Sequence, residues 1–541
     1  MKSTNNDFLT KELREVEKQI DNYYKENPLI KLPFANSAWY FMSFCEDISF
    51  KEFYSDRGSI HDAAAFADNF VVHLTYPFLW LRNSCPQGGQ VPFKFDERCY
   101  KAAWDISVLG ENYIPFESAF TLASRGLLEL RLEGTNIIPS PDYSPETKYE
   151  AYDRLIRRKE PKYSYPSLVD LIEEIESSLK VSGDNFHYQL NPRIVKYASE
   201  LLTPLTDDIY TLPDTWQFSN YTMGDFRKFS ISLSAIALIH LQARLSAAGL
   251  GCQKLGYCNS VFVAEEDELL RRLTRYSGVS VNALSCLIND LTYGNRDILK
   301  PDPAIQPLIK LNHFQYAIMP SLIISCSMER NFTVLLNKLP SERKIYSNLV
   351  SEKEKLMRES IKNGITLPNI RYFNGYIPGL TQIPDIDLAI INDKEKVCIF
   401  TELKWLIGPS EVREVIEKSE EIREGINQLL RMSEAITQNP QPFINALTID
   451  SSYKLFYVVV SENTIGMGRI QHPQIPVIQK YHFIKKIIKL GGFQKLIEWL
   501  SNRNYLPIEG KHYQVIYEDF VINKWTLTWY GIKIMIDEEF D

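Results

Sequence analysis

The stretch that decides the fold of the C-terminal part of this chain is PDIDLAIINDKEKVCIFTELKW, residues 384–405. It contains two short apolar runs, at 387–391 and 397–400, which are joined by the polar residues 392–396. Two apolar runs of strand length that flank a short polar turn predict a β-hairpin. We therefore expect two paired strands in this part of the chain.

The register of this hairpin brings acidic side chains together. A turn centred on residues 394–395 places Asp387 directly opposite Glu402 in the antiparallel pair. Side chains alternate between the two faces of a strand, so Lys404 shares the face of Glu402. For the same reason Asp385 shares the face of Asp387. We expect three carboxylates and one ammonium group to converge on one face.

Such a cluster predicts a metal site. Like charges a few ångströms apart raise one another's pKa or repel, unless a cation neutralises them. Mg²⁺ takes carboxylate oxygens and keeps several waters, so it is the expected cofactor, and Mn²⁺ is expected to substitute for it. The predicted metal ligands are Asp385, Asp387 and Glu402. The ion would polarise a phosphodiester and activate water, while Lys404 orients that water or stabilises developing negative charge.

The segments around the hairpin predict an α/β domain over residues 341–541. Its boundary follows Pro340, where helical segments give way to short β-rich runs. From the periodicity of apolar residues, the expected elements are a helix at 344–363, a strand near Arg371, the hairpin, a helix at 410–436 and a strand at 453–460.

The motifs PDID at 384–387 and ELK at 402–404 resemble the signature of the PD-(D/E)xK nuclease superfamily. In that superfamily an Asp on one strand and a Glu-x-Lys on the next form the metal site. The resemblance covers the predicted α/β domain and implies a restriction-endonuclease-like fold, with a mixed central sheet flanked by helices. It also implies a Mg²⁺-dependent endonuclease in which Asp387 and Glu402 bind metal and Lys404 assists catalysis.

The resemblance also points to residues on two helices. Many members add a metal-binding acid from the first helix, and Glu352 is the expected residue because it shares an apolar stripe with Leu349 and Leu356. Glu354 and Glu359 are the alternatives. Some exonuclease members place a glutamine on the helix that follows Glu-x-Lys. Gln428 occupies the compatible position, and its amide is expected to face the site and bind a phosphate or a water of the metal.

The first 340 residues show a different pattern. Residues 1–196 alternate aromatic-rich helical segments with Pro and Gly breaks, and residues 197–340 have mainly helical periodicity. We therefore expect a mainly α-helical N-terminal region in two parts. Its expected role is to sense a signal or to bind a partner, either another protein or a second copy of the chain.

Composition limits the class of protein. The chain has 541 residues, of which 45% are hydrophobic and 24% charged, values typical of a folded protein with several domains. The longest apolar stretch, 229–241, is too short to span a membrane, and residues 1–26 lack a secretory signal pattern, so a cytoplasmic location is expected. No GxxxxGK(S/T) loop occurs, so no nucleotide-driven motor is expected in this chain.

DNA is the expected substrate. The net charge of −8 argues against wrapping of nucleic acid by the whole chain, but Lys485, Lys486, Lys489 and Lys495 supply local positive charge for phosphate contacts. RNA is an alternative substrate, because such a site reads phosphate and metal rather than the sugar.

Two further alternatives stay open. The fold could be catalytically silent and act as a scaffold, or Glu402 and Lys404 could form an ordinary ion pair at a sheet edge. A nuclease joined to a large helical region and lacking a motor is typical of a regulated effector, such as a bacterial antiviral defence protein.

Overall fold

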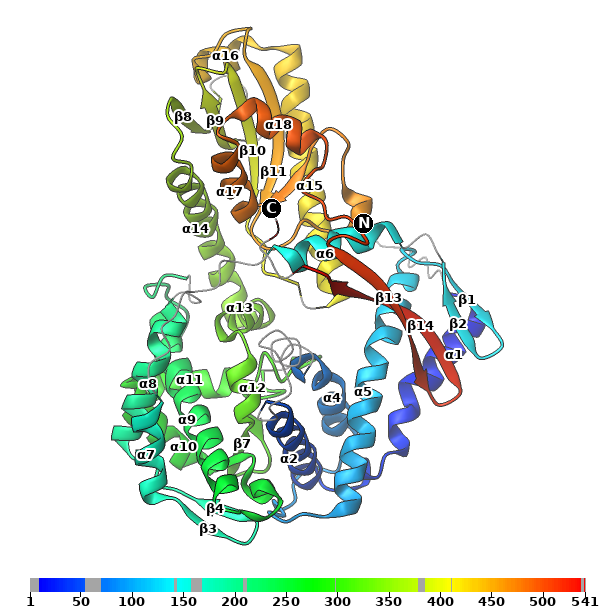
Figure 1. The fold of residues 1–541 in the computed structure, drawn as a ribbon, viewed down its shortest axis with the longest axis vertical. Helices are drawn as coiled ribbons and strands as arrows, with labels where there is room; N and C mark the ends of the chain where they lie inside the picture. The colour runs from blue at the N-terminus through cyan, green and yellow to red at the C-terminus, as the bar shows by residue number, and fades with distance from the viewer. Residues whose placement is uncertain are drawn as a thin grey trace. The chain divides into compact units, whose positions relative to one another are not determined.

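The computed structural model describes residues 9–53, 70–140, 144–156, 168–207, 212–296, 298–377, 385–409, 411–536 and 540. The chain is mainly helical and also contains mixed and antiparallel sheets (Figure 1). It divides into two compact units. Unit 1 comprises Met1–Glu15, Pro115–Glu160 and Leu349–Asp541, and unit 2 comprises Val16–Ile114 and Pro161–Asn348.

The central sheet of unit 1 is mixed. Its strands are β8 (Ile370–Gly375), β9 (Ile386–Asn392), β10 (Val397–Lys404), β11 (Lys454–Ser461) and β12 (Val477–Gln479), in the order β12-β11-β10-β9-β8. β8, β9 and β10 run antiparallel, whereas β10, β11 and β12 run parallel. The predicted hairpin is confirmed: Val397 pairs with Asn392 and Thr401 with Leu388, which is the predicted register.

Helices cover this sheet. The helices of unit 1 are the C-terminal part of α14 (Pro340–Gly364), α6 (Ser144–Leu155), α15 (Val412–Gln438), α16 (Gln441–Leu447), α17 (Lys480–Leu490) and α18 (Phe493–Ser501). α15 packs against β10 and β11, and α17 packs against β11 and β12. Every residue from Val397 to Leu403 is therefore buried. The predicted helices and strands of this region are confirmed in their order along the chain.

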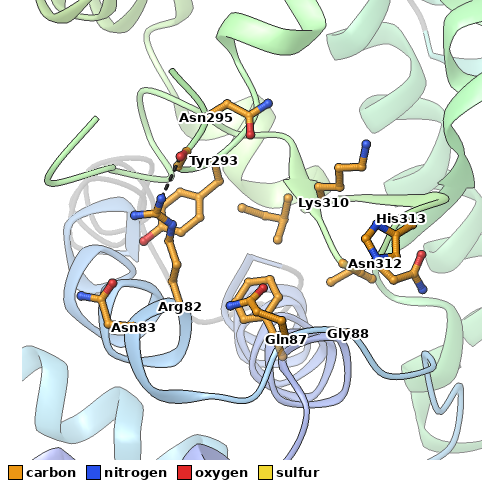
Figure 2. Close-up of a pocket in the computed structure, with 13 residues that line it drawn as sticks. Arg82, Asn83, Gln87, Gly88, Tyr293, Asn295, Lys310, Asn312 and His313 are labelled. Carbon is orange, nitrogen blue, oxygen red and sulfur yellow. Dashed lines mark hydrogen bonds between the residues drawn. The ribbon is translucent and has the colours of Figure 1, made fainter. Parts of the chain in front are cut away.

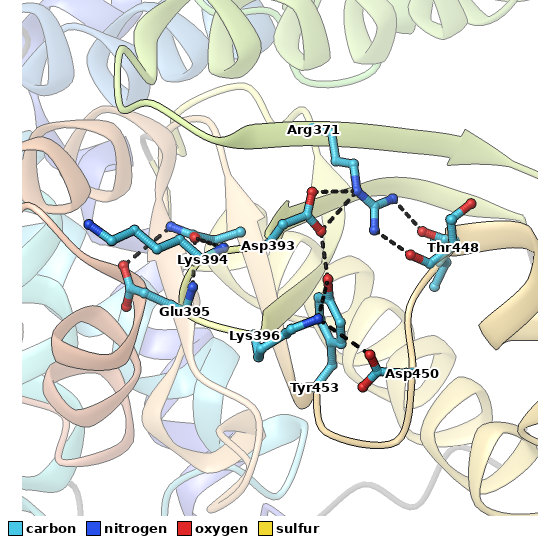
Figure 3. Close-up of polar contacts among 10 residues, drawn as sticks. Arg371, Asp393, Lys394, Glu395, Lys396, Thr448, Asp450 and Tyr453 are labelled. Carbon is cyan, nitrogen blue, oxygen red and sulfur yellow. Dashed lines mark hydrogen bonds and ion pairs between the residues drawn. The ribbon is translucent and has the colours of Figure 1, made fainter.

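A polar network fixes the turn between β9 and β10 (Figure 3). The side chain of Asn392 accepts hydrogen bonds from the backbone N–H groups of Lys394 and Glu395, both at 3.0 Å. Such a side-chain turn stabilises the chain reversal without any tertiary partner. Arg371 of β8 then binds Asp393 through Nε at 3.1 and 2.9 Å. These contacts set the hairpin register at the end of the sheet remote from Glu402.

A second sheet in unit 1 joins segments that are far apart in sequence. Its strands are β1 (Leu130–Glu133), β2 (Asn136–Pro139), β13 (Tyr513–Ile522) and β14 (Trp525–Ile534), and β2 runs parallel to β14. Asp153 of α6 is half-buried and accepts hydrogen bonds from Thr464 Oγ1 at 2.6 Å, Ile465 N at 3.1 Å and Gln479 Nε2 at 2.8 Å. Residues 115–160 thus belong to the same unit as the central sheet, a grouping that differs from the predicted division at residues 196 and 340.

Unit 2 is mainly helical, as predicted for most of the N-terminal region. Its elements are α2 (Phe34–Phe53), α4 (Thr75–Ser84), α7 (Val169–Ser178), β3 (Lys180–Ser182), β4 (Asn185–His187), α8 (Pro192–Asp207), α9 (Met223–Gly249), β5 (Phe262–Glu265), α10 (Glu266–Ser277), α11 (Val281–Asp290), β6 (Ile309–Lys310), β7 (Gln315–Ile318), α12 (Pro320–Ser325) and α13 (Met328–Lys338). The helices α1 (Lys11–Asn22) and α5 (Glu97–Ser124) cross the division between the units.

The core helix of unit 2 is α9. It is 27 residues long and apolar enough to cross a membrane, so the prediction that this segment is too short was wrong. Most of the helix is nevertheless buried against α7, α8, α10 and α12. Burial of this kind is typical of a core helix in a globular unit.

Candidate active site

Two carboxylates lie where β9 begins and β10 ends. The backbone N–H of Leu403 donates a hydrogen bond to Asp387 Oδ2 at 2.8 Å, which holds the Asp387 carboxylate against the strand that carries Glu402. Glu402 is only 4% exposed. The structure therefore brings together the two acids that the hairpin register predicted.

Lys404 and Gln428 complete this cluster. The ammonium group of Lys404 lies 2.9 Å from Glu402 Oε1 and donates a hydrogen bond to Gln428 Oε1 at 3.1 Å. Gln428 is carried by α15, so the predicted orientation of this side chain toward Glu-x-Lys is confirmed. One ammonium group thus links the strand end to the helix that covers it.

The close approach of α15 depends on a glycine that the sequence pattern did not single out. A Cβ at Gly425 would lie 2.8 Å from Lys404 Cε and 3.1 Å from Glu402 Cγ. Two carbon atoms do not come as close as 2.8 Å unless one of them is displaced. Gly425 lies three residues before Gln428 on the same helical face, and this spacing is the signal that could have identified it.

Burial and mutual repulsion control protonation in the cluster. Burial, followed by the charge of Asp387, raises the pKa of Glu402 to about 8, although Lys404 opposes the shift. Burial also raises the pKa of Asp387, and Asp385 adds to this effect. For Lys404, burial acts to lower the pKa, but the nearby carboxylates outweigh burial and raise it. The single ammonium group does not compensate for the buried carboxylate of Glu402 and the half-buried carboxylate of Asp387.

The predicted face of the first helix is wrong. The apolar stripe was placed through Leu349 and Leu356, yet Leu356 is 47% exposed. The buried face of α14 instead carries Lys353, Met357 and Ile361. The ammonium group of Lys353 lies 3.4 Å from the ring centroid of Trp405, and this cation–π contact keeps a lysine on the buried face. A hydrophobicity pattern treats lysine as exposed, and it therefore assigns the buried face of this helix incorrectly.

This rotation places Glu354, rather than Glu352, close to the cluster. Glu352 is exposed, whereas Glu354 is half-buried. Burial and then the charge of Asp387 raise the pKa of Glu354, and Lys404 opposes the shift. Glu359 forms an ion pair with Lys362 at 3.0 Å, and its side chain is 50% exposed. Glu354 is thus the carboxylate of α14 that interacts electrostatically with Asp387 and Glu402.

Arg358 is a second residue that the sequence pattern missed. It follows Glu354 by one helical turn, and its charge lowers the pKa of both Glu354 and Asp387. Its Nε is buried and has no hydrogen-bond partner among the described residues. A guanidinium group beside carboxylates is suited to contact a phosphate oxygen.

The donor set fits a hard divalent cation in its chemistry. Asp387, Glu402 and Glu354 offer carboxylate oxygens, and burial, followed by the charge of neighbouring carboxylates, raises the pKa of each. A bound cation would neutralise that charge. Asp385 is exposed at the edge of this cluster, and Pro384 lies outside the described residues. The described part of the chain contains no group of three or more His, Cys, Asp or Glu side chains close enough to hold a metal. The predicted Mg²⁺ site would therefore rely on few protein ligands and on water.

The predicted basic surface lies on α17 and α18. Lys485 and Lys486 are half-buried, and Lys489 and Lys495 are exposed. The ammonium group of Lys486 lies 4.7 Å from the ring centroid of Trp499. Contact of these lysines with nucleic acid stays a prediction.

Comparisons of this chain with protein-family models, with curated proteins and with solved structures found no match.

Proposed function

We propose that this chain is a metal-dependent endonuclease that hydrolyses phosphodiester bonds of DNA. The proposal includes a restriction-endonuclease-like core in the C-terminal region. The observation that carries it is the cluster at the ends of β9 and β10, where Asp387, Glu402, Lys404 and Gln428 meet. Two acids and a lysine at this spacing on a hairpin suit phosphodiester hydrolysis better than a structural ion pair, because one lysine cannot balance the charges of both Glu402 and Asp387.

The residues have distinct proposed roles. A divalent cation, when bound, would polarise the phosphodiester and lower the pKa of water. Asp387 and Glu402 would hold that cation. Lys404 would stabilise negative charge that develops on the phosphate, and Gln428 would keep the ammonium group oriented through their 3.1 Å contact. Arg358 would bind a neighbouring phosphate oxygen.

The basic residues of α17 and α18 support DNA as the substrate. Phosphate contacts release bound counterions, so affinity would fall as salt rises, with a slope of about −0.9 per phosphate contacted. The separate helical unit 2 and the absence of a P-loop motif support a regulated effector, such as a bacterial antiviral defence protein.

The proposal is tested by cleavage assays on the full chain. Supercoiled DNA, linear duplex, single-stranded DNA and RNA are incubated with Mg²⁺, with Mn²⁺ or with EDTA. We expect cleavage that requires metal and that is lost in Asp387→Asn and Lys404→Ala. If the protein instead cleaves RNA preferentially, the substrate is RNA rather than DNA, and the proposed active site is retained.

A matched pair on α14 provides the internal control. Glu354→Gln and Glu352→Gln make the same chemical change two residues apart on one helix. We expect a loss of at least about tenfold in cleavage for the first, equivalent to about 1.4 kcal/mol, and no change for the second. Equal activity of all four variants and the wild type would contradict the proposed site.

A catalytically silent scaffold is the second candidate. The observation that favours it is the 2.9 Å ion pair between Lys404 and Glu402, together with the lack of a group of three or more metal ligands among the described residues. Calorimetric titration with Mn²⁺ separates the two functions. A nuclease binds the ion and loses affinity in Asp387→Asn, whereas a scaffold shows no binding to lose.

A further inference from the structure

Unit 2 contains a cavity of about 640 Å³. One wall is formed by the end of α4 and the loop that follows it, and the other by the segment from Tyr293 to His313 (Figure 2). No Asp or Glu occurs among the described residues that line it. The lining side chains include Arg82, Lys310, His313 and several carboxamides, so the cavity combines positive charge with neutral hydrogen-bonding groups.

Arg82 is held in place by the opposite wall. Its Nη2 donates a hydrogen bond to the carbonyl oxygen of Gly294 at 2.8 Å. Gly294 has a φ of +74°, and a Cβ at this position would overlap the Arg82 guanidinium. The fully buried Gln306 fixes this backbone, since its Oε1 accepts from Gly294 N at 3.0 Å and its Nε2 donates to Asp290 O at 2.8 Å. The guanidinium is therefore preorganised against a supported backbone segment.

No described Asp or Glu forms an ion pair with Arg82, whereas Lys310 of the same cavity pairs with Glu266 at 2.8 Å. A half-buried guanidinium that faces a cavity whose described lining contains no acid favours an anion, and its planar set of donors matches the oxygens of a phosphate.

Tyr293 provides a second, independent observation. Its ring lines the cavity and is only 7% exposed, and its buried hydroxyl has no hydrogen-bond partner among the described residues. The ring of Tyr293, rather than its buried hydroxyl, is therefore the part of this residue that lines the cavity together with Arg82.

We propose that this cavity binds a phosphorylated small molecule of nucleotide size. Arg82 would bind the phosphate, and the ring of Tyr293 would contact the ligand. Phe34 and the carboxamides of Asn83 and Asn295 would contact its neutral part. The volume lies within the range of small-molecule sites. The inference does not rest on nuclease activity, since it concerns residues of unit 2 alone.

The test is isothermal titration calorimetry of the full chain with the four common ribonucleoside triphosphates, and with adenosine as an uncharged probe. We expect at least one triphosphate to bind and adenosine to bind at least about tenfold more weakly, the effect of losing a charge-assisted contact. Arg82→Gln should lower the affinity for the triphosphate by about 10-fold to 100-fold. Arg271→Gln is the matched control, because Arg271 is exposed on α10 and does not line the cavity.

Arg82→Lys keeps the positive charge but loses the planar donor set, and it keeps the inference testable if Arg82→Gln does not fold. We expect this variant to bind several-fold more weakly with an unchanged unfolding midpoint. The inference is overturned if no triphosphate binds at about 1 mM, if adenosine binds as well as the triphosphate, or if the two Arg82 variants bind like the wild type.

Discussion

Glu402 offers a sharp test of the candidate site, because its carboxyl is buried beside a second carboxylate. Burial and then Asp387 raise its pKa from 4.5 to about 8. Between pH 4.5 and about pH 8, the carboxyl of Glu402 is protonated in the folded chain and ionised in the unfolded chain. The stability that the neutral carboxyl provides is therefore fully present below pH 4.5 and is lost as the pH rises through about 8.

The magnitude follows from the shift. At about 1.4 kcal/mol per pKa unit, moving from 4.5 to about 8 corresponds to a loss of up to about 5 kcal/mol. In the metal-free protein, the free energy of opening the β9–β10 hairpin should fall by up to about 1.4 kcal/mol per pH unit in this window. Glu402→Gln should reduce this slope, because an amide does not titrate, and the raised pKa values of Asp387 and Glu354 account for the slope that remains.

The assay is amide hydrogen exchange of peptides from β9 and β10, measured by mass spectrometry in EDTA across the pH window and corrected for the intrinsic exchange rate. Exchange of the hairpin reports the stability of unit 1 without interference from unit 2. Glu359→Gln is the control, because it makes the same change at a half-exposed side chain of α14. If the slopes of wild type and Glu402→Gln are equal, Glu402 is ionised at neutral pH and the electrostatic argument fails.

Three further outcomes are expected. Gly425→Ala should reduce cleavage at least about tenfold (about 1.4 kcal/mol), because the new Cβ would lie 2.8 Å from Lys404 Cε; Gly249→Ala, with no atom within 4 Å, should leave cleavage unchanged. Asn392→Ala should lower the free energy of unfolding in urea by about 1–2 kcal/mol through loss of its two turn hydrogen bonds, and unchanged stability would contradict the role of this turn. Asp153→Ala should lower the free energy of unfolding by about 3 kcal/mol or more, because it leaves buried donors unpaired. Thermal unfolding measures this loss, and a midpoint equal to that of the wild type would refute the prediction.

The hairpin could be predicted from sequence because its determinants are local. The alternation of side chains fixes which residues share a face, and the turn residues fix the register, so the meeting of Asp387 and Glu402 followed from about twenty neighbouring residues. The orientation of Gln428 required only a helix of the correct phase after the second strand. The metal, the reaction and the substrate stay predictions.

Other features depend on contacts between distant segments. Lys353 is buried because it meets Trp405, and this contact rotates α14 so that Glu354 replaces Glu352 near the cluster. Residues 115–160 join unit 1 because Asp153 binds groups more than 300 positions away in sequence. Neither contact leaves a local pattern, since a lysine and an aspartate are counted as exposed by any scale of hydrophobicity.

The protonation of the cluster separates the two interpretations of Glu402 and Lys404. A structural ion pair at a strand end would favour the charged carboxylate and would leave the pKa of Glu402 low. The pKa instead rises to about 8, because burial and Asp387 together outweigh the ammonium group 2.9 Å away. The ion-pair interpretation accounts for Lys404 but not for the second, half-buried carboxylate of Asp387 beside it. A divalent cation bound by both acids, as proposed above, would offset their repulsion and lower both pKa values.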